Sequence, residues 1–267
     1  MVMLKELMSL TGRRVMITGV TGGIGHKMAE AVAEMGGNLV LVDRPESDYS
    51  AVLQSVTDLA TVEVDCIDCD LEDSDSRAKL IKELLNNEKG LDVLVNNAAF
   101  VGTSGLDGWV TDFEQQSIDT WHRAIEVNLT AAFDLSKGLY PKLKQSGHGS
   151  IINVASIYGI SGPDYSLYED TAMGNPAAYA ASKGGLLQLT RWLATTLAPE
   201  VRVNAISPGG VFRNQPEIFV ERYRNRTPLQ RMAVEDDFKG VLAYLVSDLS
   251  SYVTGQNMIV DGGWTCW

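Results

Sequence analysis

The chain has few residues of the types that build disulfide frameworks and metal centres. Its 267 residues include three cysteines and three histidines. An odd cysteine count without a secretory signal argues against a disulfide framework. Cys66 and Cys69 have CxxC spacing, but no second cysteine pair or histidine lies near them in the sequence. We interpret them as thiols packed along a strand rather than as a metal or redox site. The histidines show no ligand spacing, so no metal site is predicted.

Long apolar runs and an excess of positive charge are also missing. No apolar stretch reaches the ~18 residues of a membrane span, and residues 1–10 are too short and too mixed for a signal peptide. The 34 acidic and 22 basic residues give a formal net charge of -12. Such an acidic surface repels nucleic acid phosphates. We expect a cytoplasmic protein that binds neither membranes nor nucleic acids.

Apolar runs that read as strands alternate with helical patterns along the chain. Strands are predicted at 14–18, 38–42, 61–69, 91–95, 150–154, 201–206 and 257–260. Helical patterns are found at 28–35, 75–87, 117–138, from Tyr179 onward and at 234–249. This alternation predicts parallel βαβ units, and therefore an α/β fold with a Rossmann-type doubly wound parallel sheet. The length and the 45% apolar content fit a single domain over 1–267.

A glycine-rich turn follows the first strand and opens the first helical pattern. It contains Gly19, Gly23 and Gly25. Glycines allow the backbone to approach a diphosphate, and a helix N-terminus supplies amide donors to it. Asp43 ends the next strand about 20 residues on, where an acid accepts hydrogen bonds from the adenosine ribose. A carboxylate there repels a 2′-phosphate, so NAD is favoured over NADP. Arg44 could instead hold that phosphate, although we interpret it as stacking near the adenine.

Conspicuous residues stand at the ends of several predicted strands. They are Gly19, Asp43, Asp70, Asn97, Ser156 and Pro208. Ligands of doubly wound sheets bind at the carboxyl ends of the strands, so we expect these residues to form one site. Asp70 could hold the adenine edge, but a turn or helix-capping role is equally compatible with its position.

Tyr179 and Lys183 are four residues apart on a predicted helix, so their side chains share a face. A phenol ionises near pH ~10, and a neighbouring ammonium favours the phenolate. The pair could therefore act as a general acid or base near neutrality. The same spacing also occurs by chance between surface residues, and the rest of the chain must decide between these readings.

The order of these motifs resembles that of the short-chain dehydrogenases/reductases of the single-domain kind. The resemblance spans nearly the whole chain and rests on 18–25, Asp70-Leu71, 96–99, Asn128, Ser156, Tyr179 with Lys183, Pro208-Gly209, Gly255-Gln256 and 261–263. It implies that Tyr179 is the general acid/base. It also implies that Lys183 lowers the pKa of Tyr179 and binds the nicotinamide ribose. Ser156 would hydrogen-bond the reacting oxygen of the substrate, and Asn128 would kink its helix and hold a water on a proton path.

The resemblance also implies a set of cofactor contacts and a homotetramer. The contacts are Gly19, Gly23, Ile24, Gly25, Asp43, Arg44, Asp70, Leu71, Asn97, Ala98, Tyr179, Lys183, Pro208, Gly209 and Val211. NADP-type members often carry a basic residue where Gly22 stands here, so its absence agrees with NAD. The aromatic C-terminal residues, Trp264 to Trp267, are expected at a subunit interface.

Three departures from the family pattern bear on cofactor and substrate binding. Ala99 replaces a glycine near the cofactor, and residues 212–215 replace a threonine that usually contacts the nicotinamide. The segment 163–176 lengthens the connection between Ser156 and Tyr179. We expect 157–176 and 211–232 to form the substrate loops.

The second loop carries five arginines, Arg213, Arg222, Arg224, Arg226 and Arg231. Guanidinium groups pair well with phosphate and carboxylate, which favours an anionic substrate such as a sugar phosphate. Alternatively, the arginines pair with surface carboxylates. Residues 207–216, the long loop and the Trp-rich end look like bacterial members linked to flagellin modification and legionaminic-type sugar pathways. That finer resemblance implies a sugar derivative as substrate.

The leading functional hypothesis is an enzyme that transfers a hydride between NAD and a secondary alcohol or ketone. A dinucleotide-binding sensor or scaffold without turnover is a second class. An epimerase or dehydratase that uses NAD transiently is a third. The complete set of Asn128, Ser156, Tyr179 and Lys183 favours the first, since a binder has no need of a paired acid and base.

Overall fold

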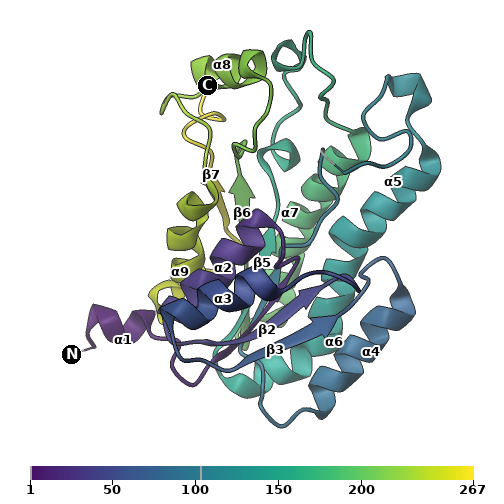
Figure 1. The fold of residues 1–267 in the computed structure, drawn as a ribbon. Coiled ribbons are helices and arrows are strands. Elements are labelled where there is room, and N and C mark those ends of the chain that lie inside the picture. The colour runs from purple at the N-terminus through teal and green to yellow at the C-terminus, as the bar shows by residue number, and fades with distance from the viewer. Residues whose placement is uncertain (1, 103) are drawn as a thin grey trace.

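A twisted parallel sheet forms the centre of the protein (Figure 1). The computed structural model describes residues 2–102 and 104–267. Over these residues the strand order is β3-β2-β1-β4-β5-β6-β7, with every pair parallel. The strands are β1 Arg14–Thr18, β2 Asn38–Asp43, β3 Val64–Asp68, β4 Val93–Asn96, β5 Gly149–Val154, β6 Val201–Pro208 and β7 Asn257–Val260. The predicted Rossmann-type fold is confirmed.

Helices cover both faces of the sheet. They are α1 Leu4–Met8, α2 Gly23–Glu34, α3 Ser50–Leu59, α4 Ser74–Asn86, α5 Ile118–Ile125, α6 Ala131–Ser146, α7 Ala177–Leu197, α8 Glu217–Arg226 and α9 Lys239–Val246. Buried residues of α2, α3 and α9 pack with Val15 and Ile17 of β1, whereas those of α4, α6 and α7 pack with Met16. Strand β1 is thus buried on both faces, which is why it reads as a continuous apolar run rather than an alternating one.

The chain order reverses between β1 and β4, which are neighbours in the sheet. In doubly wound sheets ligands bind in the crevice at such a switch point, outside the carboxyl ends of the strands. This edge is where the sequence predicts the ligand site.

Several helix predictions need correction. Residues 117–138 do not form one regular helix, because a π-helical turn at Glu126–Thr130 joins α5 to α6. The expected helix at 234–249 is shorter, since α9 spans only Lys239–Val246 with 3₁₀ turns on either side. Helix α3 was not predicted, although Val52, Val56 and Leu59 have the spacing of one helical face. Helix α8 was not predicted because its sequence is polar and only patchily periodic.

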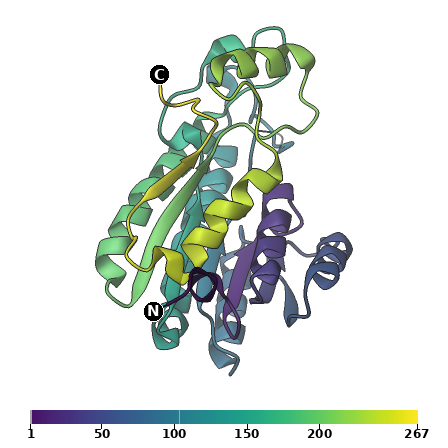
Figure 2. The same cartoon turned by 90° about the vertical axis from the view of Figure 1, so that its left-hand side faces the viewer.

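A small lobe stands above the carboxyl edge of the sheet. It combines 157–176, 211–232 and 261–267, which we call the upper lobe. Figure 2 shows α8 and the C-terminal segment in this position, away from the N-terminus. Its core is a separate cluster with Ile157, Leu167, Phe219, Tyr223 and Trp264. The two predicted substrate loops therefore pack against each other and against the chain end.

Candidate active site

The glycine-rich turn after β1 is tightly packed against the end of β4. Gly19 has φ +69°, and a Cβ atom there would lie 2.8 Å from the Cα of Ala98. Asn97 holds the turn, because its Nδ2 donates to the carbonyls of Thr18 at 2.9 Å and Gly19 at 3.0 Å. At Gly25 a Cβ atom would lie 2.2 Å from the Gly19 carbonyl oxygen. Both glycines are therefore required by the turn itself.

The N-terminus of α2 can bind an anion through its backbone amides. Gly22 is the N-cap residue, and no side chain caps the helix. The first amides of α2, at Gly23, Ile24 and Gly25, are therefore available to a diphosphate, with the helix dipole favouring its charge. The residues present fit a dinucleotide at this turn.

Glu235 lies directly beside this helix end, which the sequence did not predict. A Cβ atom on Gly23 would come within 2.6 Å of Glu235 Oε1. Arg213 Nε donates to the same oxygen at 3.2 Å. The pair reaches this place from two loops 22 residues apart, and no motif in the sequence marks it.

Asp43 faces the glycine-rich turn from the end of β2. Its Oδ2 accepts from the backbone N and the Oγ1 of Thr21, both at 2.8 Å. Its Oδ1 accepts from Arg44 N at 2.8 Å and Ser47 Oγ at 3.3 Å. A ribose would take the place of one of these hydroxyl donors. The exposed Arg44 contributes its backbone amide to this network.

Asp70 and Leu71 shape the loop that leads into α4. Asp70 Oδ1 accepts from Glu72 N at 2.9 Å, which is the turn role that the sequence left open for this residue. The Leu71 carbonyl accepts from Arg77 Nη1 at 2.6 Å. Both residues stand on the β3 side of the glycine-rich turn, as parallel pairing of β2 and β3 requires.

Ser156, Tyr179 and Lys183 meet where β5 ends and α7 begins. Ser156 is buried and accepts from Tyr158 N at 3.2 Å. Lys183 Nζ lies 5.8 Å from the centre of the Tyr179 ring, as the four-residue helical spacing predicts. Its ammonium donates to the Val154 carbonyl at 2.7 Å. The structure thus brings three of the four predicted catalytic residues to one corner of the crevice.

The electrostatics of this corner differ from the expectation for an exposed pair. Burial lowers the pKa of Lys183 to about 7. Burial also raises the pKa of Tyr179, while a hydrogen bond with Ser156 and the charge of Arg213 act in the opposite direction. The net shift of the Tyr179 pKa is therefore upward and Lys183 is not among its causes, so the lowering by Lys183 stays a prediction. A lysine that is partly neutral near pH 7 attracts a phenolate less than a permanent cation does.

Asn128 lies in the π-helical turn and ties the site to the loop after β4. Its Oδ1 accepts from Phe100 N at 2.7 Å, and its Nδ2 donates to Phe100 O and to Ser182 Oγ, both at 3.1 Å. Ser182 Oγ in turn donates to the Tyr179 carbonyl at 2.8 Å. The predicted distortion at Asn128 is present as a π turn, a feature often associated with functional sites. Ser182, absent from the predicted set, links it to the helix of Tyr179.

Pro208 ends β6, and Gly209 and Val211 lie in the segment that follows it. Gly209 donates its N–H to the Val260 carbonyl at 2.9 Å, and a Cβ atom on it would lie 2.8 Å from the Asp261 Cα. Val211 pairs with Ala233, and its carbonyl accepts from Gln215 Nε2 at 2.7 Å. Gln215 therefore closes the turn in the segment that replaces the family's usual threonine.

Most of the arginines of 211–232 are paired with carboxylates. Arg213 pairs with Glu235 at 3.2 Å, Arg222 with Asp170 at 3.5 Å, Arg226 with Asp164 at 3.5 Å and Arg231 with Asp237 at 2.6 Å. Arg224 Nε donates to the Gln230 carbonyl at 3.1 Å. This pairing matches the alternative in which the arginines balance nearby acids, and it weakens the case for an anionic substrate.

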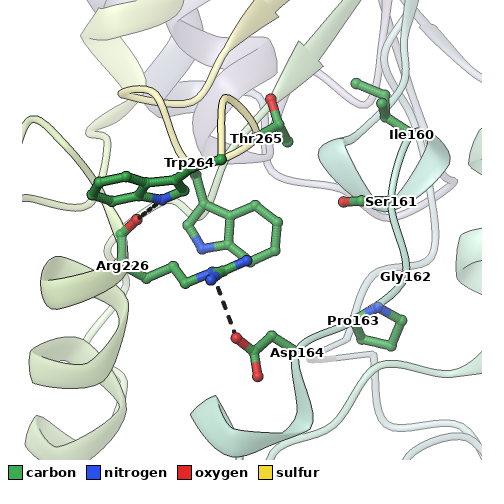
Figure 3. Close-up of a pocket in the computed structure, with 9 residues that line it drawn as sticks. Ile160, Ser161, Gly162, Pro163, Asp164, Arg226, Trp264 and Thr265 are labelled. Carbon is green, nitrogen blue, oxygen red and sulfur yellow. Dashed lines mark hydrogen bonds and ion pairs between the residues drawn. The ribbon is translucent and has the colours of Figure 1, made fainter.

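Arg226 lies in a hollow of about 470 Å³ between α8, 160–164 and the chain end. Figure 3 shows its guanidinium between Trp264 and Asp164. The guanidinium carbon is 5.2 Å from the Trp264 ring, and Trp267 Nε1 donates to the Arg226 carbonyl at 2.9 Å. Trp264 is only 2% exposed, so its side chain is already buried within its own chain.

The cysteines and the other possible ligands are dispersed. Cys66 is exposed and Cys69 is buried. Within residues 2–102 and 104–267, no cluster of three or more histidine, cysteine or acidic side chains could hold a metal ion. In the same ranges, no helix is long and apolar enough to cross a membrane.

Comparison with known proteins places these features in a wider group. A family model described as enoyl-(acyl carrier protein) reductase matches residues 19–265. The chain is 33% identical to a tropinone reductase homolog of Arabidopsis thaliana, covering 96% of this chain and 94% of that protein. It is 31% identical to a 3-oxoacyl-acyl-carrier-protein reductase of Rickettsia conorii, covering 96% and 98%. It is also 28% identical to a post-translational flagellin modification protein A of Campylobacter coli, covering 96% and 99%.

Solved structures with the same architecture carry both kinds of nicotinamide dinucleotide. A short-chain dehydrogenase from Leptospira borgpetersenii with bound NAD+ is 32% identical, with a TM-score of 0.84 over 99% of this chain and 97% of that one. A gluconate 5-dehydrogenase from Burkholderia cenocepacia in complex with NADP and tartrate is 27% identical, with a TM-score of 0.86 over 99% and 100%. The likeness extends over the whole chain in each case.

Proposed function

The chain belongs to the short-chain dehydrogenase/reductase family and is an NAD(P)-dependent oxidoreductase, and we propose that it transfers a hydride between NAD and a secondary alcohol or ketone of a sugar-like substrate. The observation that carries this proposal is the meeting of Ser156, Tyr179 and Lys183 at the carboxyl end of β5, in a fold whose α2 has an uncapped N-terminus after a glycine-rich turn. A protein that only binds a dinucleotide has no use for the side chains of Ser156, Tyr179 and Lys183 in this arrangement.

A bound nicotinamide dinucleotide supplies the hydride donor or acceptor. During oxidation the ionised Tyr179 oxygen takes the proton from the substrate hydroxyl. During reduction the Tyr179 hydroxyl gives its proton to the carbonyl oxygen. Ser156 holds the reacting oxygen by a hydrogen bond. Lys183, with a pKa near 7, exchanges a proton readily at neutral pH and stabilises the phenolate when protonated. Asn128 fixes the backbone of this corner through Phe100 and Ser182.

The glycine-rich turn and the first amides of α2 would hold the diphosphate, and Asp43 the adenosine ribose. Ala98, Asn97, Pro208, Gly209 and Val211 would border the remainder of the cofactor. NAD is preferred over NADP because the Asp43 carboxylate, placed to accept hydrogen bonds from the adenosine ribose, would repel a 2′-phosphate on that ribose. The exposed side chain of Arg44 would stack near the adenine. The preference is tested by comparing kcat/KM for NAD and NADP; a higher value with NADP would contradict it.

A sugar-like substrate is supported by the likeness to a gluconate 5-dehydrogenase, whose named substrate is a polyhydroxylated acid. The carboxylate partners of Arg213, Arg222, Arg226 and Arg231 favour a neutral sugar over a sugar phosphate. Turnover with a panel of free sugars, polyols, sugar phosphates and nucleotide sugars tests both points. We expect reduced nicotinamide to accumulate with the neutral members. Turnover of a sugar without net formation of NADH would instead support an epimerase or dehydratase.

A further inference from the structure

A second hollow, separate from the one in Figure 3, lies between two loops at the start of α7. Its volume is about 360 Å³, and it is lined by residues of 109–116 and 165–175. The Gln116 side chain joins the loops to the helix, because its Oε1 accepts from Ala177 N at 3.1 Å. Trp109, on the same wall, packs in a cluster with Ala178 and Tyr179. Trp109 thus links the wall of the hollow to the side chains packed around Tyr179, although Tyr179 itself does not line the hollow.

Asn175 lines this hollow and is the least satisfied polar residue of the region. Asn175 is only 7% exposed. Neither Nδ2 nor Oδ1 has a hydrogen-bond partner among the residues that the structure describes. A buried carboxamide with both ends unpaired costs free energy of folding, and such groups are rare in native proteins. The Asn175 carboxamide therefore needs a hydrogen-bond partner from outside the chain.

The other polar residues of the hollow indicate what that partner is. Thr111, Asp112, Gln116, Tyr165 and Thr171 bring hydroxyl, carboxylate and amide groups, and no lysine or arginine lines the described wall. A phosphate or carboxylate would meet Asp112 without a compensating cation. A hydroxyl group both donates and accepts, so it can satisfy the two ends of the Asn175 amide and tolerates the acid.

We propose that Asn175 determines specificity by binding a second hydroxyl group of the substrate, with Nδ2 as donor and Oδ1 as acceptor. This inference rests on the proposed function and deepens it, since it assigns a neutral polyhydroxylated compound as the substrate class. The two amide atoms are buried, so a substrate hydroxyl reaches them only after a local displacement of neighbouring side chains. Asn175 directly precedes Pro176, the N-cap residue of the helix that carries Tyr179.

The test compares cyclohexanol with its 1,2-, 1,3- and 1,4-diols as NAD-dependent substrates of the wild-type protein and of Asn175→Leu. Leucine keeps the approximate shape of asparagine but offers no hydrogen bond. We expect the ratio of kcat/KM for the best diol to that for cyclohexanol to fall by roughly ten-fold or more in the variant. We also expect its unfolding temperature to rise, because an unpaired buried amide has been removed.

Asn86→Leu is the matched control, since Asn86 is exposed at the end of α4, outside both predicted substrate loops. It should change neither the diol ratio nor the unfolding temperature appreciably. An unchanged diol ratio in Asn175→Leu would overturn the proposal, as would a lower unfolding temperature, which would reveal a structural partner such as a buried water.

The proposed function can fail separately. If the wild-type protein oxidises none of these alcohols with NAD or NADP, calorimetric titration with 1,2-cyclohexanediol and with xylitol still compares the two proteins. Binding that is lost in Asn175→Leu supports the hydroxyl site without the enzyme activity. Absence of binding to the wild-type protein overturns it.

Discussion

Burial sets the chemistry of Lys183. The residue is 2% exposed, and among the described residues its ammonium donates to the Val154 carbonyl alone. Its pKa is lowered to about 7 in the folded protein, whereas an unfolded lysine titrates near ~10.4. The sequence predicted which residues meet here, since a four-residue helical spacing places Lys183 beside Tyr179. It could not predict the pKa directions, because these depend on how deeply β5 and the π turn cover the pair.

The lowered pKa of Lys183 predicts a specific pH dependence of stability. Between pH 7 and about 10 the unfolded chain holds a proton on this residue that the folded protein has released. The free energy of unfolding therefore rises with pH across this window, by at most roughly 1.4 kcal/mol per pH unit for one proton. Lys183→Met should lose this slope. Urea unfolding at several pH values measures it, and parallel profiles for the two proteins would contradict the assignment.

Glu235 places a negative charge where the helix end should attract a diphosphate. We expect Glu235→Gln to tighten NAD binding, because it removes this repulsion and releases Arg213 from its ion pair. An effect of about 1 kcal/mol corresponds to a roughly five-fold lower Kd. Titration calorimetry measures it without turnover.

Glu221→Gln on the exposed side of α8 is the control for Glu235→Gln. It makes the same change in net charge away from the turn and should leave the Kd for NAD nearly unchanged. Equal effects of the two variants would mean that only the overall charge of -12 matters.

At the scale of elements, the π turn at Glu126–Thr130 is the least predictable feature of the site. The residues 117–138 have an ordinary helical period, so the sequence indicates one continuous helix. The irregularity depends on Asn128, whose amide bonds the backbone of Phe100 on a distant loop. The spacing of apolar residues within 117–138 gives no information about a partner on a distant loop. The strands, by contrast, were predicted to within a few residues, because buried parallel strands leave continuous apolar runs.

Asn128→Ala should destabilise the fold through this element. It leaves the partly buried Phe100 N–H without its acceptor and removes two bonds from Nδ2. We expect the free energy of unfolding to fall by roughly 1–3 kcal/mol. Denaturant unfolding measures it. A wild-type midpoint in Asn128→Ala would show that the π turn does not depend on this amide.

At the scale of the whole molecule, the sequence predicted the crevice but not the upper lobe. Strand ends and the glycine-rich turn lie where the alternation places them, since topology alone brings parallel strand ends to one edge. The lobe depends on contacts among three distant segments, among them Tyr158 with Trp264 and Tyr223 with Trp264. For the same reason the ion pairs of Arg222 with Asp170 and of Arg226 with Asp164 could not be foreseen.

A homotetramer remains a prediction for the assembled protein. Trp264 is buried within its own chain, but Trp267 is 69% exposed. Helices α5, α6 and α7 also each leave a large apolar side chain exposed, Ile118, Phe133 and Trp192. Such groups are commonly covered by partner subunits. Sedimentation velocity at micromolar concentration should give the mass of four chains, and a monomer would contradict the prediction.

The central claim is that Tyr179 moves the proton during NAD-dependent hydride transfer. Tyr179→Phe removes the hydroxyl and keeps the ring against Lys183. Paired measurement of NADH formation with a substrate from the panel and of the Kd for NAD tests the claim most directly. We predict that turnover falls by roughly 100-fold or more, while the Kd for NAD stays within about two-fold, since less than 1 kcal/mol of binding depends on the hydroxyl. Wild-type turnover in Tyr179→Phe would contradict the mechanism, and equal loss of NAD binding would assign Tyr179 to the cofactor rather than to catalysis.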